Sequence, residues 1–367
     1  MKIVLTGGIT GGHIYPALAI GDKFREMNPD NEIIYIASGK QLERSIIPGA
    51  GYKLYEVESE PFDRSDYVKL VKTAFRTLRG RRQALKIMKK FKPDVVISTG
   101  SYVSVPVVMA GHSYGASIYM HEQNGYPGVS NRAFAGYAKK IFLGFEGARQ
   151  YFKDDSNIMY AGNPVRKDFY GRNRNDDRRE LGISEDDLVI MVFGGSLGSE
   201  TTNDIGEAVA RTYGGKQGYT VIWGTGKNYY DEISNRLQRE GFGYDNVRIS
   251  PYIDNMPQML SAVDISISRS GALSTAETTM AGRAAIFIPS PNVTADHQYY
   301  NAKAVADEGG ALIVREDGNT EQKVLGLIEE LDTDRSIIRN MERASLSIAP
   351  LDAADIIYKT IMETYSK

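Results

Sequence analysis

The sequence of 367 residues contains no cysteine and only four histidines, His13, His112, His121 and His297. Without cysteine the chain can form no disulfide framework, no thiolate metal site and no thiol nucleophile. The histidines form no His-x-x-x-His pair, so we expect no zinc site and no other bound metal.

The chain also lacks a large excess of either charge and a long apolar run. The formal net charge is −2, whereas a nucleic-acid binder usually carries a strong basic excess, so we expect no nucleic-acid partner. No uninterrupted apolar run approaches the ~20 residues that span a bilayer, and Met1 leads directly into an apolar strand with no signal-peptide layout. We expect a protein of the cytosol or of the cytosolic face of a membrane.

Short apolar runs alternate with helical patterns along the whole chain, which is typical of a parallel α/β architecture. Expected strands cover residues 3–6, 32–37, 53–57, 94–98, 117–120, 140–143, 188–193, 220–223, 247–250, 265–268, 285–288 and 311–314. The length favours two domains. We predict two doubly wound, Rossmann-like domains facing across a cleft, at residues 1–162 and 163–348, and a helix in residues 349–367 that returns to the first domain.

A glycine-rich turn follows the first strand of each half. Residues 7–12 read Gly-Gly-Ile-Thr-Gly-Gly and precede His13, and residues 194–199 precede a second helical pattern. Such turns let a phosphate approach backbone N–H groups at a helix start. Neither turn fits a dinucleotide fingerprint or a Walker loop. His13 could act as a base or as a hydrogen-bond donor to a phosphate, and the alternative is a capping or packing histidine.

The rest of the chain is organised around residues 269–277, which follow the buried strand expected at 265–268. A strand that ends in a small-residue turn and opens a helix aims free N–H groups at one spot, where an anion can bind. Glu277 lies one turn into this helix, where its carboxylate could accept hydrogen bonds from both hydroxyls of a ribose. The alternative is an ordinary corner with a surface glutamate.

Polar residues follow two further strands of the first half. Residues 100–104 form another small-residue turn, and His121-Glu122-Gln123-Asn124-Gly125 follows the strand expected at 117–120. Buried polar side chains are costly unless they are hydrogen-bonded, so we expect the second group to line the cleft rather than the core. An exposed polar loop is the alternative.

Residues 67–92 are cationic and carry no acidic residue. Leu70, Val71, Phe75 and Leu78 recur at helical spacing among basic residues that include Lys72 and Arg76. Such a segment fits contact with an anionic membrane surface. It fits equally a helix that packs its apolar side on the sheet and exposes a basic face, and the sequence leaves both open.

These motifs, taken in order, resemble the MurG family of N-acetylglucosaminyltransferases, which make lipid II for peptidoglycan. The resemblance runs the length of the chain and rests on the following segments: Gly11-Gly12-His13, Tyr102-Val103-Ser104, His121-Glu122-Gln123-Asn124, Gly162-Asn163-Pro164-Val165-Arg166, Gly194-Gly195-Ser196, Arg269-Ser270-Gly271-Ala272-Leu273 and His297-Gln298-x-x-Asn301-Ala302. It implies a GT-B fold and transfer of GlcNAc from UDP-GlcNAc to the 4-hydroxyl of MurNAc in undecaprenyl-linked lipid I. The transfer would invert the anomeric carbon without a metal or other cofactor. The resemblance also implies a peripheral place on the cytoplasmic face of the membrane, with cell-wall synthesis proteins as partners.

The resemblance assigns roles to individual residues. His13, Asn124 and Glu122 match the catalytic positions, with the identity of the base left open. Substrate-binding roles fall on Thr10, Gly11, Gly12, Asn124, Arg166, Ser196, Ile253, Arg269, Ala272, Leu273, Ser274, Thr275, Ala276, Glu277 and Gln298. Among these, the Ile253 backbone would face the uracil, Glu277 the ribose and Gln298 the sugar.

Several positions depart from the family's usual pattern, and other functions compete with this one. Ile9 and Ser101 stand where glycine is more common, Leu197 where glutamine is common, Ser199-Glu200 where alanine and arginine are, and His297 where some members have glutamine. The nearest alternative is a related GT-B enzyme that glycosylates another lipid, such as diacylglycerol. A non-catalytic nucleotide-sugar-binding protein and a dehydrogenase are the more distant ones.

Overall fold

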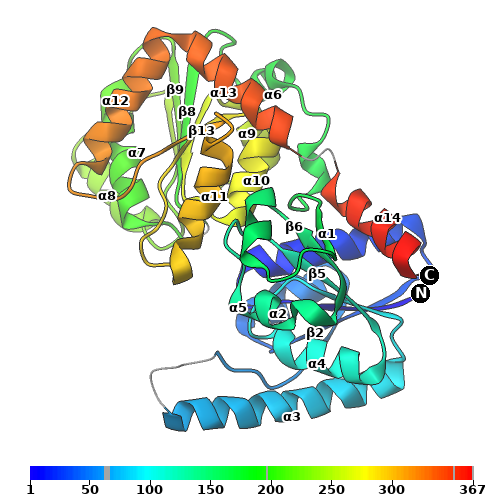
Figure 1. Ribbon diagram of the computed structural model, residues 1–367. Coiled ribbons are helices and arrows are strands. Elements are labelled where there is room, and N and C mark those ends of the chain that lie inside the picture. Colours follow the sequence, from blue (N-terminus) through cyan, green and yellow to red (C-terminus); the bar gives the residue numbers. More distant parts are fainter. Residues whose placement is uncertain (62–66, 196, 350–351, 366–367) are drawn as a thin grey trace. The chain divides into compact units, whose positions relative to one another are not determined.

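The computed structural model describes residues 1–61, 67–195, 197–349 and 352–365, with the side chains of 67–71 and 294 excepted (Figure 1). The chain divides into two compact units. One consists of Met1–Val165 together with Asp352–Lys367, and the other of Arg166–Leu351. Each unit is described by itself below.

The N-terminal unit is built on a seven-stranded parallel sheet in the order β3-β2-β1-β4-β5-β6-β7. Its strands are β1 (Lys2–Thr6), β2 (Glu32–Ala37), β3 (Lys53–Glu56), β4 (Val95–Ser98), β5 (Ser117–Glu122), β6 (Ala138–Leu143) and β7 (Ile158–Tyr160). Its α-helices are α1 (Gly11–Met27), α2 (Gln41–Gly49), α3 (Tyr67–Phe91), α4 (Ser104–Tyr114), α5 (Val129–Phe134) and α14 (Ala353–Tyr365).

Apolar residues fill both faces of this sheet, which explains why its inner strands read as continuous apolar runs. Ile3 and Leu5 of β1 belong to one buried cluster, and Val4 between them belongs to another, because successive side chains of a strand point to opposite faces. The first cluster contains Ile357 and Ile361 of α14, so the last helix completes the core of the N-terminal unit.

The C-terminal unit has a six-stranded parallel sheet in the order β10-β9-β8-β11-β12-β13. Its strands are β8 (Leu188–Phe193), β9 (Tyr219–Gly224), β10 (Val247–Ser250), β11 (Ile265–Ser268), β12 (Ala284–Phe287) and β13 (Ala311–Ile313). Its α-helices are α6 (Arg174–Leu181), α7 (Glu200–Tyr213), α8 (Tyr230–Arg239), α9 (Met256–Ala262), α10 (Ala272–Met280), α11 (His297–Ala306), α12 (Thr320–Thr333) and α13 (Arg335–Ile348).

Both sheets follow the same doubly wound order, in which the strand sequence reverses direction beside the first strand. The reversal lies between β1 and β4 in one sheet and between β8 and β11 in the other. Ligands of open α/β sheets bind outside the carboxyl ends of the strands at such a point. The topology therefore places the turns after β1, β4, β8 and β11 where ligands are expected, and it confirms the predicted fold class.

Helix α14 is fixed to α1 by several kinds of contact. The rings of Phe24 and Tyr358 meet edge to face with centroids 4.9 Å apart, and Lys23 Nζ lies 3.2 Å from the carboxylate of Asp355. Among the helices of the described residues, none combines the length and the apolar character that crossing a membrane requires.

Candidate active site

The turn after β1 is hydrogen-bonded to a buried carboxylate. Ile9 has a φ of +74°, and its backbone N–H donates to Glu43 Oε1 at 2.9 Å. Helix α1 then begins at Gly11, and its N-cap residue Thr10 makes no side-chain capping bond. The predicted ligand residues Thr10, Gly11 and Gly12 therefore surround the start of a helix, whose first N–H groups have no partner within the helix.

His13 lies in the first turn of α1 and is half-buried. Its Nδ1 is 2.9 Å from the carbonyl oxygen of Thr99 and 3.0 Å from Oε1 of Gln123. Thr99 in turn donates its hydroxyl to the backbone oxygen of His13 at 2.7 Å. The structure thus joins the turn after β1, the turn after β4 and the end of β5 through one imidazole ring.

The structure corrects the expectation that residues 121–124 line a cleft rather than the core. His121, Glu122 and Gln123 are buried, with at most 1% of their surface exposed, because β5 extends to Glu122 and the polar atoms of these residues find partners inside the protein. Only Asn124 of the quartet is half-buried. The quartet as a whole does not line an open surface.

Glu122 also needs a revised role. Its carboxylate accepts hydrogen bonds from the backbone N–H of Asn124 at 2.9 Å and from that of Gly128 at 2.8 Å. The side-chain amides of Asn124 and Asn131 donate to it as well, at 3.2 and 2.9 Å. A buried carboxylate whose oxygens accept from four N–H donors fixes the conformation of the loop that follows β5. We therefore assign Glu122 to positioning Asn124 rather than to catalysis.

The C-terminal unit has a pocket of about 460 Å³ beside the turns that follow β8 and β11. It is lined by Gly194, Gly198, Ser199, Glu200, Thr201, Tyr229, Arg269, Ser290, Asn292, Gln298 and Glu316. Two of the predicted ligand residues, Arg269 and Gln298, are thus brought together by the fold. Glu200 is exposed, so its carboxylate can turn towards solvent.

The guanidinium of Arg269 is engaged by protein groups. It forms an ion pair with Glu316, donates through Nη2 to Ser199 Oγ at 2.6 Å and donates through Nη1 to the carbonyl oxygen of Ile288 at 3.1 Å. These partners fix the turns around the pocket to one another. Arg269 is therefore a support of the pocket wall in this structure, a role that the sequence did not reveal.

The start of α10 is tied to the start of α11. Ser270 donates its hydroxyl to the backbone oxygen of Gln298 at 2.8 Å, and Asn301 donates its amide to the backbone oxygen of Ser270 at 3.0 Å. Gly271, the N-cap of α10, supplies no capping side chain. Gln298 Oε1 accepts from the N–H of Ser290 at 2.9 Å, which orients its amide nitrogen away from that backbone.

Helix α10 carries the remaining predicted donor residues. Ala272 and Thr275 are buried, and Leu273, Ser274, Ala276 and Glu277 are half-buried. Burial raises the pKa of Glu277 to about 7, and the positive charge of Arg166 acts in the opposite direction. Ile253 is buried near Gly224. Ser196 lies outside the described residues.

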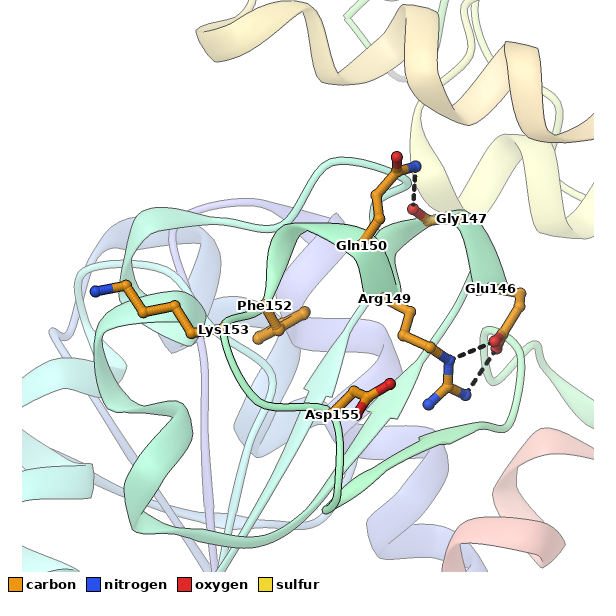
Figure 2. Close-up of a pocket in the computed structure, with 7 residues that line it drawn as sticks. All are labelled: Glu146, Gly147, Arg149, Gln150, Phe152, Lys153 and Asp155. Carbon is orange, nitrogen blue, oxygen red and sulfur yellow. Dashed lines mark hydrogen bonds and ion pairs between the residues drawn. The ribbon is translucent and has the colours of Figure 1, made fainter.

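A second pocket, on the N-terminal unit, involves none of the predicted site residues. Figure 2 shows its lining from Glu146 to Asp155, with Arg149 paired to Glu146 and Gln150 donating to the backbone oxygen of Gly147. Since none of the predicted site residues lines it, we do not assign this pocket to the site.

The sequence did not indicate which residues far apart in the chain contact one another at the site. Glu43, Thr99, Ser290 and Glu316 carry no local motif that marks them, and their roles follow from contacts across the fold. Gln123 lies inside the motif His121-Glu122-Gln123-Asn124, and its place there is the signal that could have marked it as a site residue.

Comparison with known proteins agrees with this architecture. Residues 3–143 match the glycosyltransferase family 28 N-terminal domain and residues 189–357 the glycosyltransferase family 28 C-terminal domain. The crystal structure of Acinetobacter baumannii MurG superposes with a TM-score of 0.78 at 24% identity, covering 99% of both chains, which supports the fold.

Two curated relatives are similar along the whole chain. Both are named UDP-N-acetylglucosamine–N-acetylmuramyl-(pentapeptide) pyrophosphoryl-undecaprenol N-acetylglucosamine transferase. The one from Clostridioides difficile is 36% identical, covering 100% of this chain and 90% of its own length. The one from Caldicellulosiruptor saccharolyticus is also 36% identical, covering 100% and 98%. With two family 28 domains and full-length similarity at this level, the chain belongs to the MurG family of glycosyltransferases.

Proposed function

We propose that this protein transfers N-acetylglucosamine from UDP-N-acetylglucosamine to the N-acetylmuramyl-pentapeptide carried on undecaprenyl pyrophosphate. The observation that carries this proposal is the full-length similarity to transferases of that name. The turns at both topological switch points and the pocket beside Arg269 support it.

The C-terminal unit holds the donor in this proposal. The free N–H groups at the start of α10 receive the diphosphate, because a helix N-terminus attracts negative charge. Glu277 accepts hydrogen bonds from the ribose hydroxyls, the Ile253 backbone faces the uracil and Gln298 binds the sugar. Arg166 and Ser196 serve the same donor.

The N-terminal unit binds the acceptor and supplies the base. His13 Nε2 takes the proton of the acceptor hydroxyl while its oxygen forms a bond to the anomeric carbon on the face opposite the diphosphate. The bond from that carbon to the phosphate oxygen breaks, and UDP leaves with the electron pair. The first N–H groups of α1, around Thr10, Gly11 and Gly12, and the side chain of Asn124 orient the reacting groups.

We also propose that α3 contacts an anionic membrane surface on the cytoplasmic side. Helix α3 packs along α4, and Ala84 and Met88 share a buried cluster with Val107 of α4. Gly80 lies beside Pro106 of α4, and Thr73, which is also buried, donates to the backbone oxygen of Pro61. Phe75 and Leu78 are left 65% and 47% exposed. Exposed aromatic and aliphatic side chains among basic residues favour insertion at a lipid interface.

The basic residues of α3 divide into two kinds. Lys72 is exposed, whereas Arg76 is paired with Glu60 and Arg79 with Glu58. Lys72 therefore contributes more than Arg76 to the attraction of anionic lipid. Leu70 and Val71 belong to the same helix, but their side chains lie outside the described part of the structure. Docking of cell-wall synthesis proteins on this unit is compatible with the same location.

A turnover assay tests the proposed reaction. The purified protein is incubated with a short-chain lipid I analogue and either UDP-N-acetylglucosamine or UDP-glucose, with and without EDTA, and UDP release and glycosylated product are measured. We expect product from the N-acetyl sugar alone, unaffected by EDTA. Preferred transfer of glucose, or transfer to diacylglycerol in place of the lipid I analogue, would contradict the proposal.

A further inference from the structure

Two buried side chains, those of His121 and Gln123, form a continuous hydrogen-bonded chain with the half-buried His13. His121 Nε2 lies 2.9 Å from the carbonyl oxygen of Gly162, and His121 Nδ1 lies 2.8 Å from Gln123 Nε2. Gln123 Oε1 lies 3.0 Å from His13 Nδ1. His121 and Gln123 are 0% and 1% exposed, so water does not replace any of these partners.

Backbone carbonyls at both ends decide where the protons lie. A carbonyl oxygen only accepts, so Gly162 requires a proton on His121 Nε2, and Thr99 requires one on His13 Nδ1. Neutral His121 then accepts at Nδ1, which requires that Gln123 present its NH₂ group to it. The second proton of that NH₂ group donates to the backbone oxygen of His121 at 3.1 Å.

The opposite orientation of the Gln123 amide is excluded by the same groups. It would place Oε1 against the carbonyl oxygen of His121 and an N–H against the protonated Nδ1 of His13. It would also require a doubly protonated His121, which its surroundings oppose. Burial lowers the pKa of His121 to about 4, against the opposing effect of the hydrogen bond to Gly162, and the nearby His13 also lowers it.

We propose that His121 and Gln123 are positioning residues that hold His13 in its Nδ1–H tautomer, so that Nε2 carries the lone pair that accepts the acceptor's proton. This inference rests on the proposed function for its chemical meaning. Only one of the two neutral forms of an imidazole can serve as base at Nε2, and the buried chain selects that form. His13 is half-buried, which leaves its ring accessible to a substrate.

Nitrogen-15 NMR of protein labelled at its four histidines reads the tautomers directly, because protonated and bare ring nitrogens have well-separated shifts. The His13→Gln and His121→Gln variants assign the two signals. We expect a protonated Nδ1 and a bare Nε2 on His13, and the reverse on His121. A wild-type His13 with its proton on Nε2 would overturn the proposal whether or not the protein transfers sugar.

Kinetics of Gln123→Met give a second readout. This variant keeps the side-chain length but removes both the donor and the acceptor of the amide. We expect kcat to fall about 10- to 100-fold, part of the 10²–10⁴ that a general base supplies, with the KM for UDP-N-acetylglucosamine nearly unchanged and with mixed His13 tautomers. An unchanged kcat in a variant with the wild-type melting curve would refute the inference.

Two further variants separate positioning from folding. Gln150→Met makes the same change at an exposed glutamine and should leave kcat and the His13 shifts unchanged. Gln123→Glu keeps an acceptor facing His13 Nδ1 but sets its second oxygen against both Nδ1 and the backbone oxygen of His121, so the His13 signal should keep its Nδ1–H form while the His121 signal changes. Absence of product from the wild-type protein would instead count against the proposed function and leave the NMR result valid.

Discussion

Glu43 Oε1 accepts a hydrogen bond of 2.9 Å from the backbone N–H of Ile9. The carboxylate is fully buried, and its other oxygen accepts from Ser38 Oγ at 2.8 Å and from the N–H of Lys40 at 3.0 Å. A residue of α2 thereby fixes the glycine-rich turn that precedes His13. The turn owes its shape to this carboxylate as well as to its glycines.

Replacing Glu43 with alanine should therefore destabilise the N-terminal unit and impair catalysis. The change leaves buried N–H groups without an acceptor, at a cost of roughly 1–3 kcal/mol in the free energy of unfolding. We expect a lower thermal midpoint and a reduced kcat. Glu32→Ala, which removes an exposed ion pair with Lys2, serves as the control and should change neither. Equal effects of both changes would show that Glu43 does not hold the turn.

Ser101 offers a test of backbone strain in the turn after β4. Its φ of +71° lies in the left-handed region, where a side chain costs roughly 1–2 kcal/mol relative to glycine. After the greater chain entropy of glycine is subtracted, Ser101→Gly should stabilise the protein by about 0.5–1 kcal/mol. Ser113→Gly, at an exposed position within α4, should destabilise it by about 0.5 kcal/mol. Thermal denaturation of both variants gives the direction of each change in stability. A loss of stability in Ser101→Gly would contradict the prediction.

Donor binding should depend on the protonation of Glu277, whose pKa burial raises to about 7. In the proposed complex the carboxylate would accept hydrogen bonds from both ribose hydroxyls, whereas the neutral acid has fewer acceptor sites. We expect the affinity for UDP-N-acetylglucosamine, measured by calorimetry, to fall several-fold from pH 8 to pH 6. Glu277→Gln should bind more weakly and lose most of this dependence, and Glu277→Ala should raise the donor KM or abolish turnover. A wild-type affinity in Glu277→Ala would remove the residue from the site.

The same pKa has a consequence for stability, whose sign follows from proton uptake. Between the ordinary value of 4.5 and about 7 the folded protein binds more protons at Glu277 than the unfolded chain does. The wild-type protein therefore loses stability as the pH rises through this window. The thermal midpoint of Glu277→Gln minus that of the wild type should therefore be larger at pH 8 than at pH 5. A difference that is independent of pH would indicate that Glu277 is not desolvated in solution.

Membrane contact through α3 is tested with liposomes. Phe75→Ser combined with Leu78→Ser should reduce sedimentation with anionic vesicles, and Lys72→Gln should weaken the salt-sensitive part of the binding. Val129→Ser, at another exposed apolar side chain (55% exposed), provides the matched control. Binding that persists in the double variant would assign the exposed face of α3 to solvent.

The sequence was sufficient for most of the architecture because its strands are apolar on both faces and its turns are marked by glycine. The strand expected at 188–193 coincides with β8, and the helix expected to carry Glu277 is α10. The three-residue strand β7 was missed, whereas β13, which is equally short and also lies at a sheet edge, was expected at 311–314.

The site was predictable where a motif is local and was not where a role depends on distant partners. The turn before His13 and the start of α10 could be identified from glycine and small residues that follow strands. The donors that occupy the Glu122 carboxylate extend to Gly128 and Asn131, which no local motif around Glu122 indicates. Likewise, nothing near Arg269 in sequence indicates its pairing with Glu316.

The position of α14 bears on the order in which the protein can fold during synthesis. Ile357 and Ile361 are fully buried in the core that Ile3 and Leu5 of β1 also form. That core cannot close until the residues as far as Ile361 have left the ribosome, although domains otherwise tend to fold in order from the N-terminus. The unit Arg166–Leu351 is continuous in sequence and contains all of its own core, so it can fold first. A fragment that ends at Val165 would expose the apolar surface that α14 covers, and such a fragment is expected to aggregate.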